Sequence, residues 1–257
     1  LVKSGNGTLT MLGNNQLKYT VLKSGTLSAG VDGVSFGDTL IFEGGTYRDC
    51  DNMYSYSSNA NNFCVRERKT ATFYTDSRCA YTGRLYGKGT FKVDIHYVRT
   101  ELQGNWSAFE GTLEPVNTNY GLTFNNSYGL PKATLNLPAG ATVTNTGKEF
   151  TIGKVTGSGT LGELPPFGGS GANTWKVGSL NEDFTFTATV TGNGTCFEKV
   201  GTGLMRVNSY SNFTGNCNVL EGTLCLNKLN ATSSMLGTGV LTVSSGATLS
   251  GQGKLSN

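Results

Sequence analysis

The sequence predicts an all-β protein, specifically a right-handed parallel β-helix in which short strands stack turn upon turn. Three observations predict this class. Glycine supplies 37 of the 257 residues and charged residues only 14%, against usual shares of ~7% and ~25%. Apolar residues alternate with polar ones, which is the period of a strand with one buried face. A short glycine-containing motif also returns along the chain, as it does in repeat proteins.

The recurring motif is the tripeptide G-T-L. It occurs at positions 7–9, 25–27, 111–113, 159–161 and 222–224, with close variants at 89–91, 133–135 and 247–249. Glycine and asparagine are frequent just before and between these segments, and both tolerate the left-handed backbone angles that tight corners need. The motif therefore indicates a corner followed by a strand.

The residues after each glycine alternate strictly for four to six positions. Apolar side chains take every second place in segments such as 9–11, 91–95, 135–137, 224–226 and 241–243. No segment sustains the spacing of an amphipathic helix, so we expect no long helix. A coil of ~20–25 residues per turn with strands ~4.8 Å apart would have roughly ten or more turns.

A right-handed coil follows from the crossover rule for parallel strands. A β-sandwich is the alternative, because short strands with glycine and asparagine turns also fit that class. The irregular, mostly short spacing between strands favours the coil. So do the Asn-Gly pairs at 6–7 and 193–194, which lead into a strand with no matching strand before it.

The chain is predicted to be one β-helical domain over residues 1–257. Residues 46–83 lack the motif, and we expect them to form a non-repeat insertion or a cap on the coil. Residues 160–175 contain Pro165, Pro166 and several glycines, which predicts a protruding loop or a break between coil segments.

Several segments resemble the autotransporter-associated β-strand repeat of bacterial passenger domains. They are the runs K-S-G-N-G-T-L-T-M at 3–11, E-K-V-G-T-G-L at 198–204 and L-G-T-G-V-L-T-V at 236–243, with the tail G-A-T-L-S-G-Q-G at 246–253. The resemblance covers residues 1–30 and roughly 150–257 well and 84–115 more loosely, whereas 46–83 depart from it. It implies export and surface display of a rod that carries or presents something. The repeat specifies the fold and hardly constrains activity.

Because the sequence opens inside a repeat, we expect it to be part of a longer precursor. The resemblance implies a secreted or cell-surface location. The net charge is only +3, with no basic face, so nucleic acid is not an expected partner. No apolar stretch approaches the ~18 residues of a membrane helix. Exposed strand edges at both ends of a coil would permit self-association.

Cysteine and histidine give no metal or cofactor signature. None of the six cysteines forms C-x-x-C, and the single histidine cannot complete a zinc site. Cys196 and Cys217 stand about one turn apart, so a strained disulfide and a ladder of buried thiols both remain open. No metal or cofactor is therefore expected.

The only histidine lies in a predicted strand. Alternation places Lys92, Asp94 and His96 together on the outer face. An acid–base pair is one interpretation; an exposed polar stripe is the favoured one. We accordingly assign no catalytic residue.

Region 46–83 is the most distinctive part of the sequence and supplies the candidate ligand contacts. It combines tyrosines and phenylalanines with arginines and aspartates, a mixture that suits sugar rings, although the aromatics could equally pack inward in a cap. The candidates are Tyr47, Arg48, Asp49, Asp51, Tyr54, Tyr56, Arg66 and Arg78.

These observations predict a non-catalytic, adhesin-like scaffold that presents loops to a glycan or a surface protein. The competing class is a carbohydrate-active β-helix enzyme, either a polysaccharide lyase or a glycoside hydrolase, because such enzymes need clustered carboxylates and a basic residue. A deep groove lined by Asp49, Asp51, Glu67 and Arg66 would favour the enzyme.

Overall fold

A computed structural model describes residues 1–13, 15–30, 34–49, 56–146, 148–162 and 172–256. These residues form strands, turns and bends with no helix, and the strands pair in parallel. The predicted parallel β-helix is confirmed. The β-sandwich alternative is wrong, because consecutive strands of a sandwich pair antiparallel whereas here each strand pairs with the strand one turn away.

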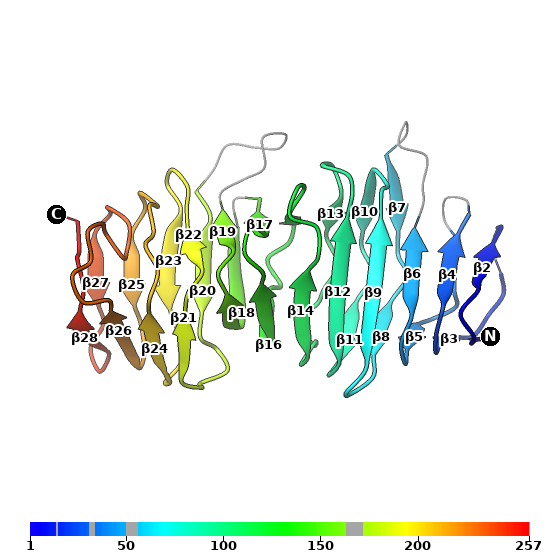
Figure 1. Cartoon of the computed structure of the whole chain (residues 1–257), viewed down its shortest axis with the longest axis horizontal. Coiled ribbons are helices and arrows are strands. Elements are labelled where there is room, and N and C mark those ends of the chain that lie inside the picture. Colours follow the sequence, from blue (N-terminus) through cyan, green and yellow to red (C-terminus); the bar gives the residue numbers. More distant parts are fainter. Residues whose placement is uncertain (14, 31–33, 50–55, 147, 163–171, 257) are drawn as a thin grey trace. The chain divides into compact units, whose positions relative to one another are not determined.

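The chain divides into two compact units, Leu1–Asn126 (unit 1) and Ser127–Asn257 (unit 2). Unit 1 has three sheets, whose strands are labelled in Figure 1. Sheet 1A contains β1 (Val2–Lys3), β3 (Thr20–Leu22), β5 (Leu40–Phe42), β8 (Phe63–Val65) and β11 (Leu85–Gly87). Sheet 1B contains β2 (Thr8–Met11), β4 (Thr26–Ala29), β6 (Thr46–Asp49), β9 (Thr70–Thr75), β12 (Thr90–Ile95) and β14 (Thr112–Pro115). Sheet 1C contains β7 (Ser57–Asn59), β10 (Cys79–Tyr81), β13 (Glu101–Leu102) and β15 (Leu122–Phe124).

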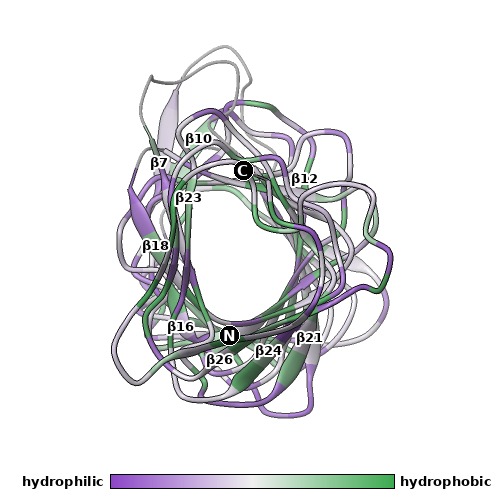
Figure 2. Ribbon diagram, turned by 90° about the vertical axis from the view of Figure 1, so that its left-hand side faces the viewer, coloured by the Kyte–Doolittle hydropathy of each residue, from purple (hydrophilic) through white to green (hydrophobic). Residues whose placement is uncertain are grey.

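Unit 2 is also built from three sets of parallel strands. Sheet 2B contains β16 (Leu130–Leu137), β18 (Glu149–Gly157), β20 (Thr174–Val177), β23 (Cys196–Lys199), β25 (Cys217–Val219) and β27 (Leu241–Val243). Sheet 2C contains β17 (Thr142–Asn145), β19 (Thr160–Gly162) and β22 (Thr189–Val190). Sheet 2D contains β21 (Phe184–Phe186), β24 (Leu204–Val207), β26 (Thr223–Asn227) and β28 (Thr248–Gln252). In each unit the backbone winds around an interior (Figure 2) that apolar side chains fill.

The G-T-L motif is a stacked corner. Gly25 has a φ of +72°, and a Cβ there would lie 2.2 Å from the carbonyl oxygen of Gly5 in the turn below. A Cβ on Gly111 would lie 2.0 Å from the carbonyl oxygen of Gly89. Successive corners therefore lie too close for any side chain, which explains why glycine returns at this point of the repeat.

Two buried lysines close corners from the inside. Lys3 is 7% exposed and Lys199 is 1% exposed. The Lys3 Nζ donates to the carbonyl oxygens of Ser4, Gly5 and Ser24 at 3.1, 2.8 and 3.0 Å. The Lys199 Nζ donates to those of Val200, Gly201 and Glu221 at 2.9, 2.6 and 3.1 Å. Each ammonium group thus uses all three of its donors on the backbone.

The described residues of region 46–83, for which we expected an insertion or a cap, contribute strands to the stacked sheets. Its strands β6 and β9 pair with each other in sheet 1B, β7 pairs with β10 in sheet 1C, and β8 pairs with β5 in sheet 1A. Within 160–175, residues 160–162 and 174–175 belong to strands β19 and β20, and 163–171 lie outside the described residues.

Candidate functional site

Strand alternation separates the predicted ligand contacts of β6. Tyr47 and Asp49 face the interior, with exposures of 0% and 6%, while Arg48 between them faces outward. A ligand outside the coil cannot reach the two inward side chains, so we remove them from the candidate contacts. Asp51 and Tyr54 lie outside the described residues.

Asp49 belongs to a buried polar network. Its Oδ2 accepts hydrogen bonds from the Tyr81 hydroxyl at 2.5 Å and from the Asn59 Nδ2 at 3.0 Å. The Asn59 Nδ2 also donates to the Tyr47 hydroxyl at 3.0 Å. The Tyr81 hydroxyl lies 2.7 Å from the Thr75 Oγ1. These contacts satisfy polar groups that burial would otherwise leave without partners.

Burial raises the pKa of Asp49 above the ordinary value of 3.8, and the nearby Asp76 carboxylate raises it further; the hydrogen bonds from Tyr81 and Asn59 oppose that shift. The network therefore acts on stability from inside the coil. The predicted groove of Asp49, Asp51, Glu67 and Arg66 is not formed by the described members of that set, because Asp49 is inside while Arg66 and Glu67 are exposed.

The outer face of sheet 1B carries the histidine. The His96 Nε2 lies 2.8 Å from the Asp94 Oδ1, and the His96 ring lies 4.7 Å from the Tyr74 ring, centroid to centroid. The Arg48 guanidinium lies over the same tyrosine, 5.1 Å from the centre of the Tyr74 ring. Alternation thus brings Asp94 and His96 together, as predicted.

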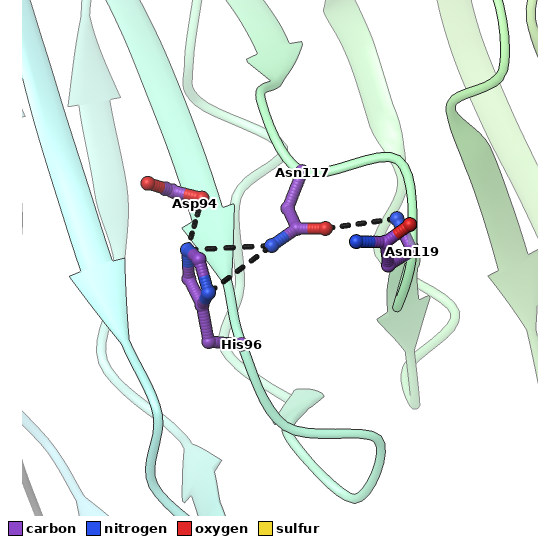
Figure 3. A network of polar contacts seen from close by, with 4 residues as sticks. All are labelled: Asp94, His96, Asn117 and Asn119. Atoms are coloured by element: carbon purple, nitrogen blue, oxygen red, sulfur yellow. Dashed lines mark hydrogen bonds and ion pairs between the residues drawn. The ribbon is translucent and has the colours of Figure 1, made fainter.

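Asn117, from the next turn, completes this cluster (Figure 3). Its Nδ2 lies 3.2 Å from the His96 Nδ1, and its Oδ1 accepts a hydrogen bond from the Asn119 backbone N–H at 2.8 Å. The arrangement holds an imidazole between a carboxylate and an amide. Chemically it can accept or donate one proton at the surface.

Tyr56 and Arg78 lie together on the outer side of sheet 1C. The Tyr56 side chain is 51% exposed, and the Arg78 guanidinium lies 5.9 Å from the centre of its ring. Two polar side chains from a later turn, Glu101 and Gln103, lie 3.4 Å from the Tyr56 hydroxyl, and Asn125 from the turn after that donates to Glu101. We call this set, Tyr56, Arg78, Glu101, Gln103 and Asn125, the Tyr56 site.

Glu101 organises the Tyr56 site. Its Oε2 accepts hydrogen bonds from the Gln103 Nε2 at 2.7 Å and the Asn125 Nδ2 at 2.9 Å. The Tyr56 hydroxyl lies 3.4 Å from the same oxygen. Partial burial raises the pKa of Tyr56 above its ordinary value, and the Glu101 carboxylate raises it further. The phenol is therefore protonated at neutral pH and available as a hydrogen-bond donor.

Sequence reasoning missed three members of this site. Tyr56, Arg78, Glu101 and Asn125 stand 22, 23 and 24 residues apart, which is one turn of the coil each time. This spacing is the only sequence signal for Glu101 and Asn125, and it varies from turn to turn; Gln103 follows Glu101 by two residues, the spacing of one strand face. Arg66, the last candidate, is exposed beyond the end of β8 on sheet 1A and does not join the Tyr56 site.

Cys64, Cys196, Cys217 and Cys225 are free thiols. Cys217 pairs in register with Phe197 rather than with Cys196, so the side chains of Cys196 and Cys217 take opposite faces of sheet 2B. Burial raises the pKa of Cys217 to about 12. The disulfide left open between these two residues is therefore not formed, and Cys217 packs as a small apolar residue.

Among the described residues, no group of three or more histidine, cysteine, aspartate or glutamate side chains is placed to hold a metal ion. The described part of the chain also contains no helix with the length and apolarity needed to cross a membrane. Comparisons with protein-family models, curated proteins and solved structures found no match. The fold and the surface chemistry define a parallel β-helix with polar and aromatic clusters on its outer faces.

Proposed function

We propose that this chain is a non-catalytic, secreted or cell-surface β-helix that binds a glycan through the Tyr56 site. The observation that carries the proposal is the Tyr56 ring, which is 51% exposed and stands beside a charged and amide-rich neighbourhood. Sugar rings pack their apolar faces on aromatic side chains, and their hydroxyls need nearby donors and acceptors.

The Tyr56 site is organised before any ligand arrives. Glu101, Gln103 and Asn125 already hold one another by hydrogen bonds, so little side-chain freedom would be lost on binding. The strands beneath them belong to a continuous parallel sheet, which is a stiffer support than a loop. The resemblance of the corner motif to exported passenger repeats supports display outside the cell.

The test is a glycan-array screen of the wild-type protein and three variants. Tyr56→Ala removes the ring and should weaken binding at least about fivefold, since aromatic packing is worth ~1 kcal/mol. Tyr56→Phe keeps the ring and should lose less. The matched control is Tyr120→Ala, because Tyr120 is a similarly exposed tyrosine (46%) outside the site. Unchanged binding of Tyr56→Ala, or no glycan bound by the wild type, contradicts the proposal.

A carbohydrate-active enzyme is the second candidate, and the pair of Asp94 and His96 at 2.8 Å is the observation that favours it. Such an enzyme would release new reducing ends from a polysaccharide. If the wild type releases reducing ends and His96→Ala does not, the catalytic proposal replaces the binding proposal.

A further inference from the structure

The outer face of sheet 1A has an apolar floor. Ile41, Cys64 and Tyr86 pair in register on β5, β8 and β11, and all three face outward. The outer rows of sheet 1B carry polar residues instead, such as Thr72, Lys92 and Glu114 in one register row. An apolar row on the outside of a coil leaves a surface that a ligand can cover.

This floor lies in a groove of ≈ 320 Å³. Tyr19, which is 49% exposed, stands beside it one turn earlier. The Tyr86 hydroxyl lies 2.7 Å from the Thr39 Oγ1. Thr39 precedes β5, two turns before β11, so the Tyr86 side chain extends along the coil axis and is fixed at both ends. Tyr86 is thus a rigidly held aromatic part of the groove floor.

Two charges at the rim of the groove have no ion-pair partner among the residues that the structure describes. Lys18 and Arg66 both line it, and neither makes an ion pair with a described carboxylate, whereas Lys88 and Lys92 pair with glutamates at 3.0 and 3.3 Å. Asp38 also lines the rim, and its backbone N–H donates to the Lys18 carbonyl oxygen at 2.8 Å. Two cations and one carboxylate leave the groove with a net positive charge.

We infer that this groove binds an acidic oligosaccharide, one whose sugar rings carry carboxylates. The apolar ring faces pack on Ile41 and Tyr86, and a ring carboxylate lies between the cations Lys18 and Arg66. Hydroxyl groups of the sugar donate to Asp38. Turns repeat every ~4.8 Å, so an extended oligosaccharide along the coil axis meets a new floor residue at each turn.

The groove is a second site beside the one proposed above. That its ligand is a glycan rests on the proposed function. The two sites are physically distinct, because the Tyr56 site belongs to sheet 1C and the groove to sheet 1A. One experiment can therefore distinguish the failure of each.

Cys64 provides a direct report on the groove. Its half-buried thiol is free and lies on the floor, so a bound ligand covers it. Burial raises the pKa of Cys64, partly offset by Arg66, so alkylation is followed at mildly alkaline pH. Cys225, a half-buried free thiol on β26 in unit 2, is the internal reference.

The experiment measures alkylation of each cysteine by peptide mass spectrometry, with an oligogalacturonate or a neutral oligosaccharide of equal length as probe. We expect the acidic probe at saturation to slow alkylation of Cys64 at least about fivefold and to leave Cys225 unchanged. Arg66→Gln should abolish the protection, and Tyr86→Phe should weaken it less than Tyr86→Ala. Tyr56→Ala should leave it intact.

Three results would overturn the inference: equal alkylation of Cys64 with and without the acidic probe, equal protection by the neutral probe, or full protection in Arg66→Gln. The wild-type measurement needs no variant to fold. If Cys64 is unprotected while Tyr56-dependent glycan binding persists, the groove is wrong and the proposed function stands. If Cys64 is protected while the Tyr56 variants bind normally on the array, the groove is a binding site and the Tyr56 site is not.

Discussion

Units 1 and 2 stack their strands by the same rule but fill the interior differently. In unit 1 the inward rings of Tyr47, Phe73 and Phe91 on sheet 1B lie nearly parallel, at interplanar angles of 11° and 3°. They belong to two register rows, because Phe73 pairs with Tyr47 and Val93 whereas Phe91 pairs with Ala71. In unit 2 a single inward register row of sheet 2B contains Phe150, Trp175, Phe197 and Cys217. The aromatic ladder of unit 1 therefore crosses between two register rows, whereas that of unit 2 follows one row as far as a thiol.

The buried polar groups of the two units also differ. Unit 1 buries the Asp49 carboxylate with tyrosine hydroxyls around it. Unit 2 buries the neutral Asn173, whose Nδ2 donates to the Gly162 carbonyl oxygen at 3.0 Å and whose Oδ1 accepts from the Thr195 Oγ1 at 2.6 Å. Tyrosines therefore have two roles in unit 1: the Tyr47 ring belongs to the aromatic ladder, and the Tyr81 hydroxyl donates a hydrogen bond to the buried Asp49 side chain.

The largest expected effect tests the aromatic ladder. Phe73 has ring contacts with Tyr47, Phe63, Tyr81 and Phe91, and Phe73→Ala should cost ~3–5 kcal/mol of unfolding free energy through the cavity it leaves. Phe197→Ala in unit 2 should cost less within that range, because the Phe197 ring contacts are those with Phe186 and Phe213. Urea unfolding of both variants measures the difference.

The two tryptophans make this measurement specific to each unit, since Trp106 lies in unit 1 and Trp175 in unit 2. In a repeat protein a substitution lowers the stability of neighbouring turns most, because each turn contacts only its neighbours. Fluorescence of a Trp175→Phe background should therefore report the Phe73→Ala loss more strongly than that of a Trp106→Phe background. If Phe73→Ala and Phe197→Ala lose the same unfolding free energy with both tryptophan reporters, the two ladders do not differ in their contribution to stability.

An intermediate effect tests a feature that the two units share. Lys199→Met leaves three backbone carbonyl oxygens without donors in a position that is 1% exposed, which should cost ~1–3 kcal/mol. Lys3→Met removes the same type of cap where the lysine is 7% exposed, so it should cost less. Chemical denaturation followed by each tryptophan checks both values; a larger loss for Lys3→Met would show that burial does not set the strength of these caps.

The stacked fold could be predicted from the sequence because its causes are local. Corner glycines and apolar alternation can be recognised directly in the amino-acid sequence. Alternation alone assigns Tyr47 and Asp49 to one face of the strand and Arg48 to the other. Region 46–83 lacks the G-T-L motif, although the segment T-A-T-F-Y-T at 70–75 alternates like any other strand.

The surface clusters could be predicted only in part. Asp94 and His96 are two residues apart on one strand, so alternation is enough to join them. Tyr56 meets Glu101 and Gln103 across turns of unequal length, and the sequence does not state which residues of neighbouring turns lie in register. The register is set by the packing of whole turns against one another, which no short motif encodes.

The smallest expected effect concerns the pH dependence of unit 1. Burial raises the pKa of Asp49, so the folded protein disfavours its carboxylate form. The stability contribution of protonated Asp49 is fully present below the unfolded value of 3.8 and is lost as the pH rises through the higher folded pKa. Asp49→Asn cannot titrate and lacks this loss.

The unfolding free energy of the wild type should therefore fall relative to that of Asp49→Asn as the pH rises from acidic to neutral. The hydrogen bonds from Tyr81 and Asn59 stabilise the carboxylate and keep the effect modest. Urea midpoints over this pH range, followed by Trp106, measure the difference, and Trp175 serves as the reference because the buried network of Asn173 has no carboxylate. A difference that stays constant with pH, or that is as large at Trp175 as at Trp106, would show that the buried charge does not distinguish the two units.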